Sequence, residues 1–397
     1  MKILHSADWH LDSPFASFDG EPRAFLQQAQ RRIPERLRAL CAEEHCDLVL
    51  LAGDIFDGSY SRETAALLAD ALEDCGVPVF ISPGNHDFYG PESPWVRENW
   101  PANVHIFSGR LSYVDLPELD CRIYGAGYGA MDCPGVLEGF RAEREFGHTV
   151  AVLHGDPTGG RSPYCPITAS QVRDSGLDYL ALGHIHQSGS FRAGDTLCGW
   201  PGCPMGRGWD ETGPKGAFLV SLDAQAQIRQ VPLGLPLFWD VNLRLEEENG
   251  PEQLLPPTES TDFYRVTLTG TGEVDIPGLL SRFAYLPHLE FRDRTEAPVA
   301  LWDEIGEDSL RGIFFGMLRS ALDRAEPEEA ERKDEEKPEK RRTFVLKDVR
   351  VFLNTLSRSI DLMKQGGIDA GIQREETDDS LILTISIPKA RQPSQNG

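Results

Sequence analysis

The sequence has no long hydrophobic run, since none of its windows approaches the roughly 18 consecutive apolar residues of a membrane-spanning helix. It also leaves no room for a cleaved N-terminal signal, because the strand-like run KILHSA already starts at Lys2. With 397 residues, of which 40% are hydrophobic and 26% charged, the chain is expected to be globular, to have two or three domains and to have no membrane partner.

None of the eight cysteines forms a CxxC pair, which excludes a zinc ribbon. In a chain of this length the cysteines are expected to be reduced, so a cytoplasmic location is the default.

The chain also lacks an excess of basic residues. It has 39 Lys and Arg but 63 Asp and Glu, which gives a net charge of −24. This balance argues against tight non-specific DNA binding by the chain alone, because such binding comes largely from basic groups that release phosphate counterions. A phosphate-cleaving site is still compatible with it, provided that metal cations hold the phosphate locally. A partner could then supply a wider basic surface.

The first 235 residues alternate strand-like and helix-like runs, which indicates a layered α/β fold. The helical patterns cover residues 21–45 and 61–75. From Ser188 onward the pattern changes to short β runs that are expected to close a second sheet. The candidate strands before that point are 2–7, 46–53, 77–82, 121–128, 149–155 and 177–183.

Beyond Pro236 the pattern changes again, and four further segments are predicted. They are a small α+β domain at 237–297, an amphipathic helix at 299–324, a charged linker at 325–342 and a C-terminal α/β segment at 343–397.

Polar motifs with metal-binding chemistry follow five of the candidate strands, each directly past the carboxyl end of its strand. They read DWH at 8–10, GDIFD at 53–57, GNHD at 84–87, HGD at 154–156 and GHIH at 183–186. Each motif alone could be an ordinary turn, because Gly, Asn and Asp are turn residues. If the strands belong to one parallel or mixed sheet, however, all five motifs converge at one edge. Chance is a poor explanation for five such coincidences.

The candidate ligands are carboxylate, imidazole and one amide, without thiolate, which suits Mn²⁺, Fe²⁺ or Zn²⁺ better than a structural zinc site. Seven ligands are too many for one ion and fit two ions with a shared carboxylate, a pair that can activate water and clamp a phosphoryl group. The most economical assignment gives one ion Asp8, His10 and His186, the other Asn85, His154 and His184, and makes Asp54 the bridge.

Together, these motifs resemble the calcineurin-like metallophosphoesterase superfamily over residues 1–235, and within it the SbcD-type DNA repair exonucleases and their YhaO-like branch. The stretches HSADWHLDSPF, DYLALGHIHQ and LCGWPGCPMGRGWDETGPKGAFLV carry the resemblance. It implies a four-layer α/β/β/α sandwich with a small α+β cap domain and a C-terminal helical segment. It also implies two divalent metal ions, with Mn²⁺ expected, and a DNA substrate. The implied partners are an SbcC-like coiled-coil ATPase, with the helix at 299–324 as its candidate dock, and a second copy in a homodimer.

The same resemblance makes His86 the residue that contacts phosphate and helps to protonate the leaving oxygen. Asp57 is expected either to orient His86 or a metal ligand, or to cap its loop. Trp9 and Phe88 are expected to shape or cover the site.

Two other functions stay open at this stage. One is a phosphoesterase that acts on small nucleotides or another phosphoester, which the negative charge favours. The other is a non-catalytic scaffold for an ATPase partner, which the C-terminal segments favour and the full ligand set opposes.

Overall fold

The protein is described by a computed structural model that covers residues 1–159, 161–245, 251–296, 316, 371–377 and 380–386. The chain divides into two compact units, Met1–Glu296 and Ala297–Gly397. Within the described residues, no helix is both long and apolar enough to cross a membrane.

Two six-stranded β-sheets lie at the centre of the first unit. In the first sheet, β1 to β4 run parallel to one another and β11 and β12 are antiparallel additions. Its order is β12 (Ala226–Val231), β11 (Ala217–Leu222), β1 (Lys2–Ser6), β2 (Leu48–Leu51), β3 (Val79–Ile81) and β4 (Val104–Ile106).

The second sheet has four parallel strands at its centre, flanked by an antiparallel strand at each edge. Its order is β5 (Ser112–Leu116), β6 (Cys121–Ala126), β7 (His148–His154), β8 (Tyr179–Gly183), β10 (Thr196–Trp200) and β9 (Gly189–Ala193), and the 3₁₀ turn η1 (Pro117–Leu119) connects β5 to β6.

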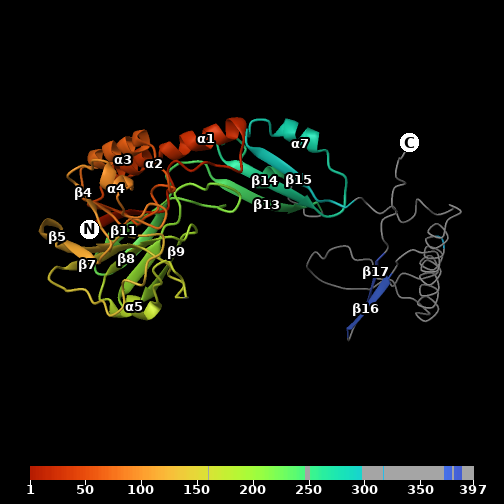
Figure 1. The fold of residues 1–397 in the computed structure, drawn as a ribbon. Helices are drawn as coiled ribbons and strands as arrows, with labels where there is room; N and C mark the ends of the chain where they lie inside the picture. Colours follow the sequence, from red (N-terminus) through yellow and green to blue (C-terminus); the bar gives the residue numbers. More distant parts are fainter. Residues whose placement is uncertain (160, 246–250, 297–315, 317–370, 378–379, 387–397) are drawn as a thin grey trace. The chain divides into compact units, whose positions relative to one another are not determined.

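Strands β2 and β3 of the first sheet are buried along their whole length, so their sequences are continuous apolar runs. In β2, Leu48 and Leu50 point toward the second sheet, whereas Val49 and Leu51 point toward the helices. Figure 1 shows α1–α3 on one side of the sheets and α5 on the other, which gives the predicted α/β/β/α order. The helices are α1 (Gly20–Arg31), α2 (Ile33–Glu43), α3 (Arg62–Asp74), α4 (Pro94–Arg97) and α5 (Ala169–Asp174).

The helical pattern predicted for 21–45 forms two helices rather than one. The first ends at Arg31 and the second begins at Ile33, with Pro34 in its first turn. Proline lacks the amide hydrogen that a helix interior needs and is tolerated in a first turn, so the chain starts a new helix there.

Residues 238–293 form a parallel three-stranded sheet that carries its own apolar cluster. At its start, Phe238 and Phe263 stack with ring centroids 4.7 Å apart and join the core beneath α1 and α2. The predicted separation of this sheet as a domain at 237–297 stays a prediction. Its elements are β13 (Phe238–Arg244), α6 (Pro251–Leu254), β14 (Phe263–Thr269), α7 (Ile276–Arg282) and β15 (Leu289–Asp293).

In the second unit, β16 (Gly371–Thr377) pairs antiparallel with β17 (Ser380–Ser386). The predicted helix at 299–324 apart from residue 316, the linker at 325–342 and most of the segment at 343–397 lie outside the described residues.

Candidate metal centre

The predicted metal-binding motifs meet at one end of the two stacked sheets. They do not come from a single sheet, because β1, β2 and β3 belong to the first sheet and β7 and β8 to the second. Strands buried on both faces look alike in sequence, which is why the pattern does not separate the two sheets. The loops of both sheets nevertheless touch: the backbone amide of His184 donates to Asp8 Oδ1 over 2.9 Å.

Four residues of these loops have left-handed backbone conformations, with φ of 54° at Asp8, 47° at His10, 50° at Asp54 and 100° at His184. Residues other than glycine rarely adopt such values, and they concentrate at functional sites. Between them, Gly53 has a φ of 86°, and a Cβ atom there would lie 2.5 Å from His154 Nδ1. The loops therefore approach each other too closely for a side chain at this position.

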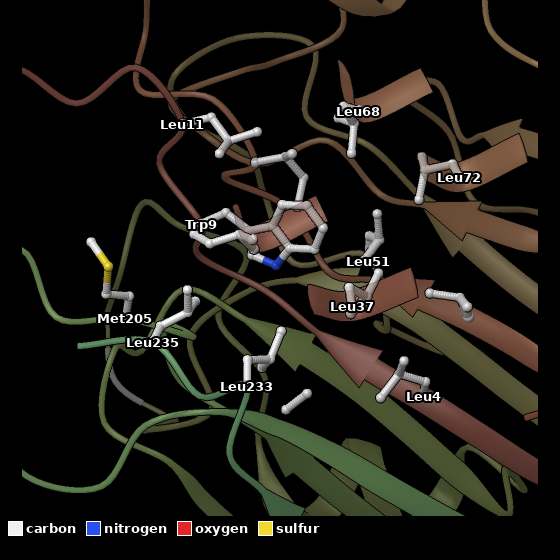
Figure 2. Packing of buried hydrophobic residues seen from close by; sticks show 14 of the residues in the cluster. Leu4, Trp9, Leu11, Leu37, Leu51, Leu68, Leu72, Met205, Leu233 and Leu235 are labelled. Carbon is white, nitrogen blue, oxygen red and sulfur yellow. The ribbon is translucent and has the colours of Figure 1, made fainter. Parts of the chain in front are cut away.

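Trp9, which was predicted to shape or cover the site, separates Asp8 from His10 in sequence and does not cover the site. Its indole is 1% exposed and packs among Leu11, Leu37 and other core residues, as Figure 2 shows. Its Nε1 donates to Ser6 Oγ over 2.8 Å. With Trp9 anchored in the core, its neighbours Asp8 and His10 are held at the site.

Asp8, His10 and His186 form the first group that could hold a metal ion, called a metal-binding group below, in which one ligand atom from each lies within 4.8 Å of the others. The Nε2 atoms of His10 and His186 are only 3.1 Å apart. Their Nδ1 atoms face carboxylates, at 3.1 Å from Asp57 and 2.6 Å from Glu211, so each Nδ1 carries the hydrogen. Two lone pairs thus point at each other, an arrangement that a shared cation satisfies.

Asp8, Asp54 and His154 form the second group. His154 Nδ1 donates to the Ala52 carbonyl over 2.8 Å, which leaves Nε2 as an acceptor. That atom faces two further acceptors, Asp54 Oδ2 at 3.3 Å and Asn85 Oδ1 at 3.1 Å. When His154 is neutral, three acceptors face one another here, and either a bound cation or a proton on Nε2 satisfies them.

The electrostatics of this second group favour positive charge. Burial lowers the pKa of His154, but Asp54, Asp8 and the hydrogen bond to the Ala52 carbonyl together outweigh burial and raise the pKa to about 9. Burial opposes ionisation of Asp54 as well, yet His154 and His10 hold the pKa of Asp54 below its usual range. The pocket therefore keeps Asp54 ionised and favours a positive charge beside it.

His184 and Asn85 both belong to the predicted ligand set, but their surroundings in the structure differ from each other. The amide oxygen of Asn85 faces His154, as described above. His184 is in none of the three metal-binding groups found among the described residues. Its ring lies 5.2 Å from the ring of His154 and 4.9 Å from that of Tyr164, measured between centroids.

His86 and Asp57 lie at the open side of the centre, where the His86 side chain is 41% exposed. Asp57 Oδ1 is 3.1 Å from Nδ1 of both His86 and His10. The hydrogen bond to Asp57 raises the pKa of His86. His86 also forms the third metal-binding group, with His10 and Asp54.

Three functional neighbours were missed by the sequence analysis. Glu211 and Arg207 come from the segment between β10 and β11, and Glu211 accepts from both Arg207 and His186 Nδ1. Asp87, the last residue of GNHD, accepts from the amides of Gly84 and Ile55 and so ties the β3 loop to the β2 loop. Burial, with Asp54 nearby, raises the pKa of Asp87 to about 7. Only the spacing of Arg207 and Glu211, four residues apart in a Gly-rich loop, could have drawn attention to them.

Replacing Glu211 by alanine should weaken Mn²⁺ binding by about 10- to 100-fold, because partners of metal-ligating histidines contribute that much to affinity. The carboxylate orients His186 by holding its Nδ1 hydrogen. Equilibrium dialysis against Mn²⁺ measures the effect, with the exposed Glu92→Ala variant as the control. An unchanged Mn²⁺ affinity in Glu211→Ala would contradict the role of Glu211 in orienting His186 for metal binding.

Residues 1–188 match the family described as calcineurin-like phosphoesterase. Residues 344–386 match the nucleoid occlusion protein C-terminal domain.

Three curated relatives are similar to the chain. The uncharacterized metallophosphoesterase YhaO of Bacillus subtilis is 34% identical over 237 residues, which cover 55% of this chain and 57% of that protein. The SbcD component of the nuclease SbcCD from Staphylococcus epidermidis is 35% identical over 123 residues, or 30% of this chain and 31% of its own. The same component of the Bacillus subtilis nuclease is 25% identical over 264 residues, which cover 54% of this chain and 64% of that protein. The chain thus spans less than two thirds of each relative.

Proposed function

We propose that this protein, whose residues 1–188 match the calcineurin-like phosphoesterase family, is a phosphoesterase that works with two divalent cations. The observation that carries the proposal is the position of Asp54 Oδ2, which lies 3.3 Å from His154 Nε2 and 3.8 Å from His10 Nε2. One carboxylate oxygen therefore faces histidines of both metal-binding groups, as a bridging ligand would.

The donor atoms fit such cations, since buried nitrogen and oxygen acceptors face one another without thiolate. Manganese is the proposed metal. Two bound cations would supply activation of water and stabilisation of phosphoryl charge. The proposed ligands of one cation are Asp8, His10 and His186, those of the other are Asn85, His154 and His184, and Asp54 is shared.

We assign to His86 the contact with the phosphate and the proton for the leaving oxygen. Its Nδ1 is held by Asp57, which leaves Nε2 directed away from that carboxylate and available to a substrate. The proton that His86 carries at Nε2 would pass to the leaving oxygen as its bond to phosphorus breaks. Asp57 keeps the ring oriented, and its hydrogen bond raises the pKa of His86 and so stabilises the positive charge of the ring.

We propose DNA as the substrate, hydrolysed as in an exonuclease of DNA repair. The support is the similarity to components of two SbcCD nucleases and the resemblance of the motifs to that group. A coiled-coil ATPase would then be the partner that supplies the basic surface. The net charge of −24 favours a second candidate, a phosphoesterase for small nucleotides, since these need no extended basic groove.

The substrate is tested by comparing end-labelled DNA with bis-p-nitrophenyl phosphate in Mn²⁺, using the wild-type protein and a chelator control. We expect Mn²⁺-dependent release of nucleotides from DNA. Hydrolysis of the small diester alone would favour the second candidate, and hydrolysis of neither would contradict the phosphoesterase. Pull-down from native extract, followed by the nuclease assay with and without ATP, tests the ATPase partner.

A further inference from the structure

Arg207 is a cation placed directly beside the metal centre, although it is not one of its ligands. Its Nη2 donates to Glu211 Oε1 over 2.8 Å and lies 3.2 Å from His186 Nδ1. Its Nη1 points the other way and lies 3.8 Å from Asp57 Oδ1, beyond hydrogen-bond distance. The guanidinium therefore spans the rim between a predicted metal ligand and the carboxylate that holds His86.

The segment that carries Arg207 is held in place on its other side. Trp209 packs against the Phe238 ring at 5.2 Å, and the Arg265 guanidinium lies 3.8 Å above the centre of the indole. Glu211, whose side chain is 5% exposed, fixes Arg207 through both Nε and Nη2. One edge of the guanidinium is thus committed to the protein, and its orientation is set before any ligand arrives.

The other edge is available to a ligand, because the Arg207 side chain is 23% exposed and its Nη1 lies 3.8 Å from Asp57 Oδ1, the oxygen that is 3.1 Å from His86 Nδ1. Guanidinium is planar and permanently charged, and it recognises phosphate oxygens through parallel hydrogen bonds. We propose that Arg207 is an anion-contacting residue of this site, which binds a non-bridging oxygen of the substrate's phosphate through its Nη1 edge. This inference rests on the proposed phosphoesterase function and adds a phosphate contact supplied by the chain itself.

The inference is tested with Arg207→Ala and with Arg207→Gln, which can keep a hydrogen bond to Glu211 without the charge. Metal content is measured by atomic emission, and binding of inorganic phosphate to the Mn²⁺-loaded protein by calorimetry. We expect both variants to retain wild-type metal content and to bind phosphate at least about tenfold more weakly, the loss expected for one charge-assisted hydrogen bond. The control is Arg62→Ala, which removes an arginine that is 84% exposed on α3.

Two results would overturn the inference while leaving the phosphoesterase intact. Unchanged phosphate affinity at full metal content would mean that Arg207 only neutralises Glu211 and Asp57. Loss of metal in both variants would make it a positioning residue for His186. A wild-type protein that binds neither Mn²⁺ nor phosphate would instead remove the proposed function and this inference together.

Discussion

Replacing Asp54 by alanine should abolish Mn²⁺ binding and lower turnover by at least about 10³-fold, the effect of losing several kcal/mol of transition-state stabilisation. The reason is geometric. Asp54 Oδ2 faces His154 and His10, and Oδ1 accepts the backbone amide of His86, so one side chain joins the loops of β2, β3 and β7. Mn²⁺ should raise the melting temperature of the wild-type protein but not that of the variant, because only the wild type gains binding energy in the folded state.

The matched control for this experiment is Asp19→Ala, which removes a carboxylate that is 97% exposed and pairs with Arg23. Metal content and turnover of the control should equal those of the wild type. An Asp54→Ala protein with full metal content and full activity would refute the bridging assignment.

His86→Ala should retain its metal and lose about 10²- to 10⁴-fold in turnover, the range expected for removing a general acid. The His86 side chain is exposed at the rim and its ring is held through Nδ1 by Asp57. Turnover and metal content are measured on the same preparation. His148→Ala is a suitable control, because His148 begins β7 at the end opposite His154.

His86 also lies close to His10 and Asp54, which leaves a clear opposite outcome. If His86→Ala lost one equivalent of metal together with its activity, His86 would join the ligands and its role as an acid would be withdrawn.

The strands of the first 235 residues were predictable because apolar runs are local features, whereas the four-layer order was predicted only from the resemblance of the motifs to a known family. The strand at 46–53, for example, was recognised from CDLVLLAG and is observed as Leu48–Leu51. The sequence did not predict which strand belongs to which of the two sheets. A strand buried on both faces has no alternation of polar and apolar residues that would indicate its neighbours. The break between α1 and α2 was missed although Pro34 marks it.

The candidate site was predictable where its residues follow strands and was not where they come from loops. His184 and His186 share one motif after β8, yet only His186 lies in a metal-binding group. Glu211 and Arg207 come from a loop without periodicity, and their contact with His186 arises only from tertiary packing. Trp9 was predicted to shape or cover the site, and its 1% exposure shows that it lies in the core between the two ligands rather than over them.

The left-handed backbone at Asp8, His10 and Asp54 has a further consequence. Each such residue costs roughly 1–3 kcal/mol, against a total stability of about 5–15 kcal/mol for a typical domain. Glycine at these positions would relieve the backbone and destroy the centre in one step. The same three positions therefore affect both thermal stability and the proposed metal centre. Selection for thermal stability alone would favour substitutions here that remove the ligands.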